Sequence, residues 1–462
     1  MLWNHWWALV CQLRSACARE MTFLWMAVCL AGMAVRTELL GVTSTIRALG
    51  LEQACYDRLL DLFHRPTLDL SRLTRIWCAL VFRIYLGILC VNGSAVLVGD
   101  GLKVAKAGRK MPGVKKLHQQ SESSTRPEFI FDHCCQVVAV LTQALASVFA
   151  LPLACRFREG IVFSDRDKRT LLDKMILLLD SLEMGWKCSC RSTSSQTHTI
   201  PTARWFAAWW PRETTSCRGS RATAWPTSRP RPSRATDRGV AEGPKNTATR
   251  SWSQSYLNRS KNSSKRSAPS MASRGALSRP VLAPVSILVR FVAVSHPRRG
   301  TILLMSTDMK LSPLDIIRIY GLRFKIELSF KQALAYSYHF WMAIMTPMRR
   351  VIGNQYLHRK SDAYRNTVRR KCFAYDRHIQ LRLIAQGIAT ILSAIQPKLI
   401  WQSFGSWIRT IQPGLAASQL LAVALRQTLP EFLAAEPNSS ILVKFIRSRL
   451  DLSRTEGTRL AA

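Results

Sequence analysis

The chain has 462 residues, of which 48% are hydrophobic and 20% charged, so it can bury a core and is long enough for two or three domains. Its 66 Lys and Arg residues exceed its 28 Asp and Glu residues by 38, which favours a polyanionic partner such as DNA or RNA, with anionic membrane as the competing partner. The 13 cysteines match no zinc-ligand spacing and no secreted disulfide framework, so we expect reduced, intracellular thiols.

Residues 1–93 predict a helical N-terminal region with long apolar runs. The run "MTFLWMAVCLAGMAV", between Glu20 and Arg36, is 15 residues long, whereas a membrane-spanning helix needs about 20. A later run, "IWCALVFRIYLGILCVNGSAVLVG", carries Arg83, whose charge is costly in hydrocarbon. We therefore interpret these runs as buried helices and expect no contact with a membrane, and a membrane protein is the remote alternative.

Within this region, "GVTSTIRALGLEQACYDRLLDLFHR" has the outline of a helix-turn-helix. Thr43 or Ser44 can cap a short helix, and Gly50 separates it from a second, amphipathic one. Two short helices joined by a glycine are also a common packing unit, so the outline predicts a DNA-binding function only weakly.

From Ser94 the pattern changes to one typical of strands. The run "SAVLVGDGLKVAK" predicts a strand that ends at Asp100 and Gly101, and a polar loop follows it. The later run "CQVVAVLTQALASVFALPLACRF" predicts a further strand or a buried helix, and "RTLLDKMILLLDSL" predicts a helix. An Asp at the end of a strand can also be a simple loop cap.

The segment from Lys187 to Pro280 differs from both of its neighbours. It holds 18 Lys and Arg residues against 3 acidic ones and few large aliphatic residues, so we expect it to be disordered and to form no strand of a core. One interpretation is a disordered basic insertion that binds nucleic acid. The other is translation out of frame.

The letters of the segment favour the second interpretation. Synonymous codons for "SCRSTSSQTHTIPTARWFAAWWPRE", read one nucleotide earlier, permit "LPVYFVADAYYTNGKMVRGLVAEG", a buried strand that ends in an aspartate and precedes a helix. The aspartate codon straddles the codons of Gln196 and Thr197. We therefore expect a frameshifted segment at about 187–287, with the frame restored near residues 280–288.

Regular structure returns after this segment. "LVRFVAVSHPRRGTILLMSTD" predicts two strands around a turn, and Ser312, Pro313 and Asp315 predict the capped start of the helix "LDIIRIYGLRFKIELSFKQAL". The remaining residues, 346–462, predict a helical, basic C-terminal region.

Four side chains on that helix are spaced by three, four and four residues: Tyr320, Arg323, Glu327 and Lys331. Such spacing places them on one face. A solvated face of ion pairs is the alternative to a functional site.

Three stretches together resemble a bacterial insertion-sequence transposase of the DDE type with an RNase H-like catalytic domain. They are "VLVGDGLKVAKAGRKMPGVKKLHQ", "RFVAVSHPRRGTILLMSTDMKLSPLDIIRIYGLRFKIELSFKQAL" and "GNQYLHRKSDAYRNTVRRK". The resemblance covers about residues 20–185 and 288–462, and its most specific part is the signature Tyr, x2, Arg, x3, Glu, met by Tyr320, Arg323 and Glu327. Lys331 lies nearer to Glu327 than in the commonest family pattern.

The resemblance implies an α/β fold: an RNase H-like mixed sheet with helices, its catalytic domain divided between residues 94–186 and 288–345, flanked by helical regions and interrupted by the frameshifted segment. It implies that Asp100 and Glu327 are catalytic ligands of Mg2+ or Mn2+, and that Tyr320, Arg323 and Lys331 contact DNA phosphate. Transposon ends and target DNA are the implied partners, with a homo-oligomer as the active form, in the bacterial cytoplasm at the nucleoid.

The middle carboxylate of the family's three is missing from the expected place. No Asp in the shifted segment replaces it, because Asp237 has no strand before it, and Asp165 and Asp167 are better explained as a helix cap. We therefore expect a transposase-family protein that binds DNA and is impaired in cleavage and strand transfer. The main alternative is a non-enzymatic basic DNA-binding protein with a disordered arm.

Overall fold

In the computed structural model the chain forms two compact units. Unit 1 comprises Met1–Arg204 and Lys325–Ala462, and unit 2 comprises Trp205–Phe324. The described residues are 1–37, 41–84, 87–105, 114–118, 129–144, 147–157, 171–189, 204–207, 218–221, 281–282, 287–288, 290–296, 300–329, 360–407, 418–434 and 440–461.

The N-terminal region is helical, as predicted. Its elements are α1 (Leu2–Cys11), the short 3-10 helix η1 (Arg14–Ala16), α2 (Glu20–Val35), α3 (Val42–Ala48), α4 (Cys55–His64) and α5 (Leu70–Ile84). Helix α2 is apolar around its whole circumference and is buried along most of its length, which explains the apolar run without a membrane.

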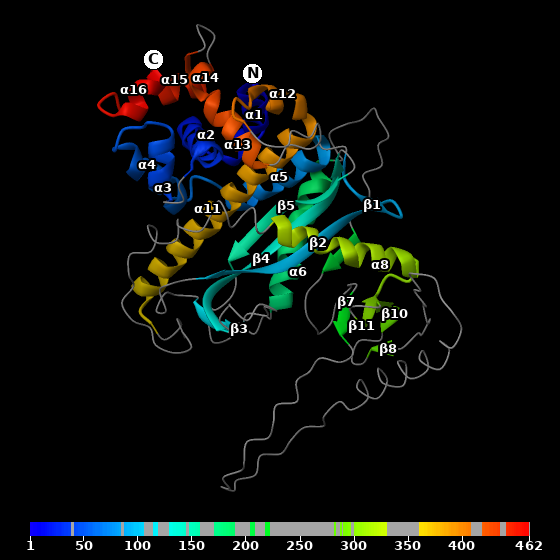
Figure 1. Ribbon diagram of the computed structural model, residues 1–462. Helices are drawn as coiled ribbons and strands as arrows, with labels where there is room; N and C mark the ends of the chain where they lie inside the picture. The colour runs from blue at the N-terminus through cyan, green and yellow to red at the C-terminus, as the bar shows by residue number, and fades with distance from the viewer. Residues whose placement is uncertain are drawn as a thin grey trace. The chain divides into compact units, whose positions relative to one another are not determined.

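The C-terminal region is also helical, as predicted. It contains α11 (Asp362–Ile395), α12 (Pro397–Ser403), α13 (Ser418–Gln427), α14 (Leu429–Ala434), α15 (Ile441–Arg447) and α16 (Thr455–Ala461). Figure 1 shows these helices beside the N-terminal ones, from opposite ends of the chain. Trp3 joins the two sets: its indole Nε1 donates to Leu425 O at 3.0 Å and its ring stacks on Phe432 at 5.1 Å between centroids.

An antiparallel sheet forms the other layer of unit 1. Its strands β1 (Cys90–Val91), β2 (Ser94–Ala105), β4 (Phe129–Ala144) and β3 (Lys115–His118) are neighbours in that order, and β5 (Ser147–Phe157) also pairs with β4. The run predicted to be a strand or a buried helix is thus the two strands β4 and β5. The structure combines helices and strands, as predicted, but all pairings among β1 to β5 are antiparallel, so the expected mixed sheet is not found among these strands.

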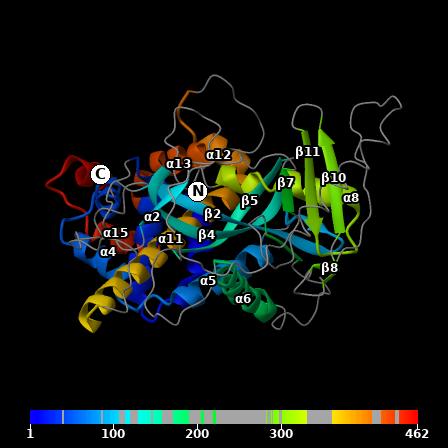
Figure 2. The same ribbon diagram turned by 90° about the horizontal axis from the view of Figure 1, so that it is seen from below.

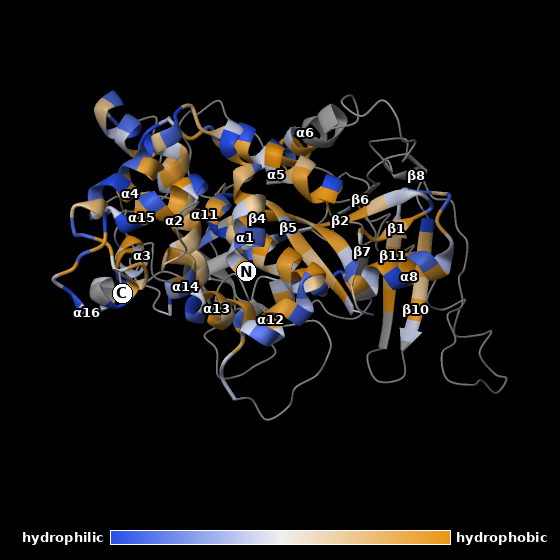
Figure 3. Cartoon of the chain, turned by 90° about the horizontal axis from the view of Figure 1, so that it is seen from above, coloured by the Kyte–Doolittle hydropathy of each residue, from blue (hydrophilic) through white to orange (hydrophobic). Residues whose placement is uncertain are grey.

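The apolar residues of the sheet explain where the core lies. Figure 3 shows β4 and β5 hydrophobic along most of their length, whereas α4 and α5 carry both hydrophilic and hydrophobic residues. Helix α6 (Leu171–Ser189) lies against β2 at Gly99, where an added Cβ would be 3.5 Å from Met175 Cε. Strands in which polar and apolar residues do not alternate are suited to a sheet that is buried on both faces. Amphipathic helices are suited to covering such a sheet.

Helix α11 closes the exposed edge of this sheet with polar side chains. In both views it lies beside the sheet (Figure 1, Figure 2). Asp376 Oδ1 accepts from Phe157 N at 2.7 Å, and Gln380 accepts from Cys155 N at 3.4 Å and donates to Leu153 O at 3.0 Å. The outer side of an edge strand carries backbone N–H and C=O groups that no strand pairs with. Asp376 and Gln380 are four residues apart on the helix, and this distance along the helix matches the distance between residues two apart on the strand, so both side chains reach outward backbone groups.

Arg156 of β5 is buried, with 6% of its surface exposed, and its guanidinium bonds to both flanking helices. Its Nη1 donates to Gln380 Oε1 at 2.7 Å and its Nη2 donates to Thr74 Oγ1 of α5 at 2.6 Å. Gln380 therefore satisfies a buried charge as well as two backbone groups.

Burial raises the pKa of the neighbouring Cys78 thiol to about 12, with the Arg156 charge opposing the shift.

By length and composition, α11 is the one helix of the described residues that could cross a membrane. Its apolar window is 72% buried inside the protein. Its polar side chains bond to other elements: Arg382 Nη1 donates to Met33 O at 3.1 Å, and Arg377 Nη1 donates to Phe63 O at 2.8 Å. Burial in the protein accounts for its apolar composition.

Unit 2 contains the predicted hairpin. Strands β10 (Arg290–His296) and β11 (Gly300–Ser306) pair antiparallel, β7 (Arg218–Arg221) joins β11 at its other edge, and β8 (Val281–Leu282) pairs with β9 (Ile287–Leu288). Helix α8 (Pro313–Leu322) begins as predicted, with Ser312 Oγ accepting from Asp315 N at 3.1 Å.

The basic segment does contain two short strands, β6 (Arg204–Ala207) and β7, although we expected none in a core. Strand β6 spans the boundary between the units. Backbone hydrogen bonds at a sheet edge need no apolar side chains, so a segment rich in Arg and Ser can supply β7. The expected disorder falls mainly on residues outside the described ones and stays a prediction.

We predict that Gln380→Leu lowers the free energy of unfolding of unit 1 by about 2–4 kcal/mol, because it leaves Cys155 N, Leu153 O and the Arg156 guanidinium without this partner. Urea denaturation followed by circular dichroism measures the change. As the matched control on α11, Asn366→Ala removes an exposed side chain that only accepts from Arg369 at 3.3 Å, and should change stability by less than about 0.5 kcal/mol. Equal effects of both variants would contradict the assigned role of Gln380.

A second prediction concerns the crossing of α11 and α5. A Cβ on Gly387 would lie 2.2 Å from Trp77 Cζ2, and Trp77 is fully buried with its Nε1 donating to Pro152 O at 3.0 Å. Gly387→Ala should therefore cost about 1–3 kcal/mol through overpacking, seen as a lower Tm. Gly321→Ala in α8, where nothing beyond the neighbouring residues and the helix's own backbone lies within 4 Å of the added Cβ, should leave Tm unchanged or raise it.

Candidate functional site

Asp100 lies in the middle of β2, not at the end of a strand as the sequence predicted. The strand continues to Ala105, and Asp100 pairs with Val137 of β4. Its Oδ1 accepts from the backbone N of Gly101 at 2.7 Å, and the side chain is half-buried. The strand continues beyond the apolar run because its pairing with β4 depends on backbone hydrogen bonds. The end of the strand was predicted from side-chain types, which do not limit this pairing.

The predicted helix that carries the other site residues is interrupted. Helix α8 ends at Leu322, Arg323 and Phe324 form a turn, and helical structure resumes over residues 325–329. Gly321, with its low helix propensity, comes directly before this end. Arg323 Cζ lies 5.5 Å from the centroid of Tyr320 and 4.9 Å from that of Phe324, so two aromatic rings hold the guanidinium at the break.

Glu327 belongs to the helical turn after this break and is exposed. The turn is anchored to α11, because Gln386 Nε2 donates to Ser329 O at 3.0 Å and Ile326 is fully buried. The division between the units falls after Phe324, which places Tyr320 and Arg323 in unit 2 and Glu327 in unit 1. The expected shared face therefore stays a prediction, and Lys331 lies outside the described residues.

The expected metal site lacks a complete set of ligands in the described part of the chain. No group of three His, Cys, Asp or Glu side chains gathers there in a way that could hold a metal ion. The position at which we expected the middle carboxylate, at Gln196 and Thr197, lies outside the described residues. Convergence of Asp100 and Glu327 is likewise still a prediction.

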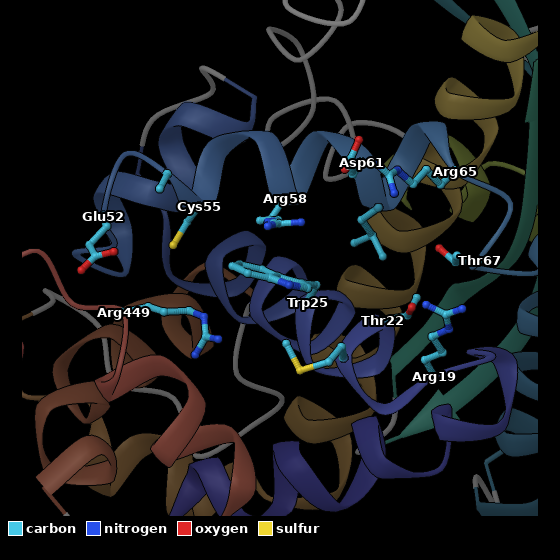
Figure 4. Close-up of a pocket in the computed structure, with 13 residues that line it drawn as sticks. Arg19, Thr22, Trp25, Glu52, Cys55, Arg58, Asp61, Arg65, Thr67 and Arg449 are labelled. Atoms are coloured by element: carbon cyan, nitrogen blue, oxygen red, sulfur yellow. Dashed lines mark ion pairs between the residues drawn. The ribbon is translucent and has the colours of Figure 1, made fainter.

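A basic pocket lies among the helices of unit 1. Its volume is about 490 Å3, and it is lined by residues of α2 and α4, by residues just outside the ends of these helices, and by Arg449, which follows α15. Four arginines, Arg19, Arg58, Arg65 and Arg449, line the pocket together with two acidic residues, Glu52 and Asp61. Figure 4 shows Arg449 and Glu52 toward one end, Arg19 and Arg65 toward the other, and Trp25 between them.

The charges of this pocket are not balanced. Arg65 pairs with Asp61 at 2.9 Å, and both side chains are well exposed, so this pair contributes little to stability. Among the described residues, neither Arg19 nor Arg58 has an acidic side chain within ion-pairing distance. Four positive charges against two negative ones leave a site that attracts anions.

Aromatic packing fixes the side chains of Arg449 and Trp25. Arg449 Cζ lies 3.7 Å from the centroid of Phe445 and 5.6 Å from that of Trp25, and its Nη1 donates to Phe445 O at 2.9 Å. Trp25 meets Phe445 edge-on, at 5.1 Å between centroids. Both side chains are therefore held in place before any ligand binds.

The thiol of Cys55 also lines this pocket. Burial and, secondarily, the Glu52 carboxylate raise its pKa, with Arg449 opposing the shift. The thiol is therefore protonated at neutral pH, which favours a packing role over a nucleophilic one.

The sequence analysis pointed to α4 only as part of a helix-turn-helix outline and did not identify the pocket. Cys55, Arg58 and Asp61 recur every three residues along α4, a spacing that places them on one face. Arg449 could not be found in this way, because it comes from the other end of the chain and only tertiary packing brings it to Trp25.

Comparisons with known proteins give little further information. No protein-family model matches the chain, and no curated protein matches it. Among solved structures, it is similar to a piggyBac transposase synaptic complex with hairpin DNA, with 11% identity over 95% of this chain and 78% of the other. The TM-score of 0.33 is too low to identify a fold or a function.

Proposed function

We propose that the chain is a DNA-binding protein of transposase descent that does not carry out strand transfer at a rate typical of that family. The observation that carries the DNA-binding part is the excess of 38 positive charges over 462 residues. Arginines that neutralise phosphates release condensed counterions from DNA, which drives binding without regard to base sequence. The basic pocket of unit 1 supports the same partner.

The transposase part of the proposal rests on the residues of the sequence motif. Asp100 and Glu327 correspond to the first and third carboxylates of the DDE pattern, and Tyr320 and Arg323 complete its helical signature. Arg323 and Lys331 would contact DNA phosphate in an RNase H-like catalytic domain. A homo-oligomer is the expected active form.

The donor set does not fit the divalent ions that this family uses. Carboxylate oxygens suit Mg2+, yet the described residues hold no cluster of three candidate ligands, and the sequence supplies no aspartate at the middle position. Two carboxylates do not supply enough ligands for a pair of metal ions. In phosphoryl transfer most of the rate enhancement comes from the positioning of the reacting groups and from the charge of the metal ions.

For binding, we predict a steep dependence on salt. Affinity for duplex DNA, measured by fluorescence anisotropy, should fall about a thousandfold between roughly 50 and 200 mM salt if about six phosphates are neutralised. An affinity that changes less than about twofold over this range would contradict charge-driven binding.

For catalysis, we predict that the chain does not cleave DNA in Mg2+, whereas a variant with the frame restored over the segment at about 187–287 does. Gel analysis of labelled transposon ends measures this. In the restored variant Asp100→Asn should abolish cleavage, and the matched change Asp180→Asn, at an exposed position of α6, should not. Cleavage by the unaltered chain, independent of Asp100 and Glu327, would overturn both the site and the frameshift. A restored variant that binds DNA but remains inert would favour the non-enzymatic alternative.

A further inference from the structure

The basic pocket of unit 1 combines three features that a surface for duplex DNA does not require together. It is a cavity of about 490 Å3, it has arginines toward both ends, and an indole lies between them. A surface for duplex backbone needs exposed cations alone, because phosphates are contacted from outside. A concave site with an aromatic wall suits a ligand that enters it.

The volume and the aromatic wall together favour a nucleotide base as that ligand. Trp25 lines the pocket, and its packing against Phe445 and Arg449 leaves it little freedom to lose on binding. Stacking of a base on an aromatic side chain is tolerant of base identity, since every base has a π-face. A paired base inside a duplex cannot reach such a wall, so the base must be unpaired.

The arginines account for the phosphates on either side of that base. Arg449 lies toward one end, and Arg19 and Arg65 lie toward the other (Figure 4). Arg58 lines the same cavity from the face of α4. Guanidinium groups form bidentate hydrogen bonds with phosphate, and a nucleotide within a strand has one phosphate on each side of its sugar.

We propose that this pocket binds one unpaired nucleotide of a DNA strand, with the base against Trp25 and the flanking phosphates at the arginines of the two ends. The proposal rests on the proposed DNA-binding function and names the part of DNA that this site takes. It gives the helical region a preference for single-stranded or distorted DNA, which a duplex-backbone surface would lack.

The test uses a probe small enough to report on the pocket alone. Thymidine 3′,5′-bisphosphate carries one base and both flanking phosphates, and deoxyribose 3′,5′-bisphosphate is the matched probe without the base. Isothermal titration of the full chain should show the thymidine probe binding about five- to a hundredfold tighter, the range that one stacked base contributes. Inorganic phosphate should bind weakest of the three.

Substitutions in the pocket test the binding of the base and the binding of the phosphates separately. Trp25→Leu should remove the difference between the two bisphosphates, while Trp25→Phe should retain most of it, because phenyl also stacks. Arg58→Ala, at an exposed position that keeps the fold, should weaken both probes. The matched control Arg72→Ala removes an exposed arginine of α5 outside the pocket and should change neither.

The possible outcomes distinguish this inference from the proposed function. Equal binding of the two bisphosphates by the unaltered chain would overturn base stacking, and equal losses in Arg58→Ala and Arg72→Ala would overturn the pocket. If duplex DNA still binds with a steep salt dependence in either case, only the pocket assignment fails. If no DNA binds at low salt, the proposed function itself fails.

Discussion

The edge of strand β5 sets the main constraint on unit 1. Among the described residues, no strand pairs with its outward backbone groups, and a buried N–H or C=O without a partner costs about 1–3 kcal/mol. Asp376 and Gln380, one turn apart on α11, bond to Phe157 N, Cys155 N and Leu153 O. Without this helix the sheet would present an edge open to other chains, so α11 stabilises the sheet by pairing with its edge as well as by packing beside it.

The same helix also determines where the N-terminal helices lie. Arg377 bonds to the carbonyls of Phe63 and Leu68, at the ends of α4 and of the loop before α5, and Arg382 bonds to Met33 O of α2. Because α2 and α4 form two walls of the basic pocket, their positions on α11 fix its width. The pocket is thus a consequence of how one long helix satisfies the polar groups around it.

The two candidate sites differ in what holds them. At the basic pocket, ring contacts and a main-chain hydrogen bond fix Trp25 and Arg449. At the predicted catalytic residues, Asp100 accepts from Gly101 N inside a strand, and Glu327 is an exposed side chain on a short helical turn. Binding of an anion therefore has better structural support here than metal-dependent chemistry, which needs several oxygen ligands held at one point.

The sequence by itself determined the local elements whose signals are local: the capped start of α8 at Ser312, the hairpin of β10 and β11, and the helical character of both termini. It also determined the charge that implies a polyanionic partner. Only the tertiary structure decided that β2 runs past Asp100, because strand length depends on the partner β4, and that Arg449 reaches Trp25. The physical reason is that capping and periodicity act within a few residues, whereas strand pairing and pocket walls join backbone and side chains hundreds of residues apart.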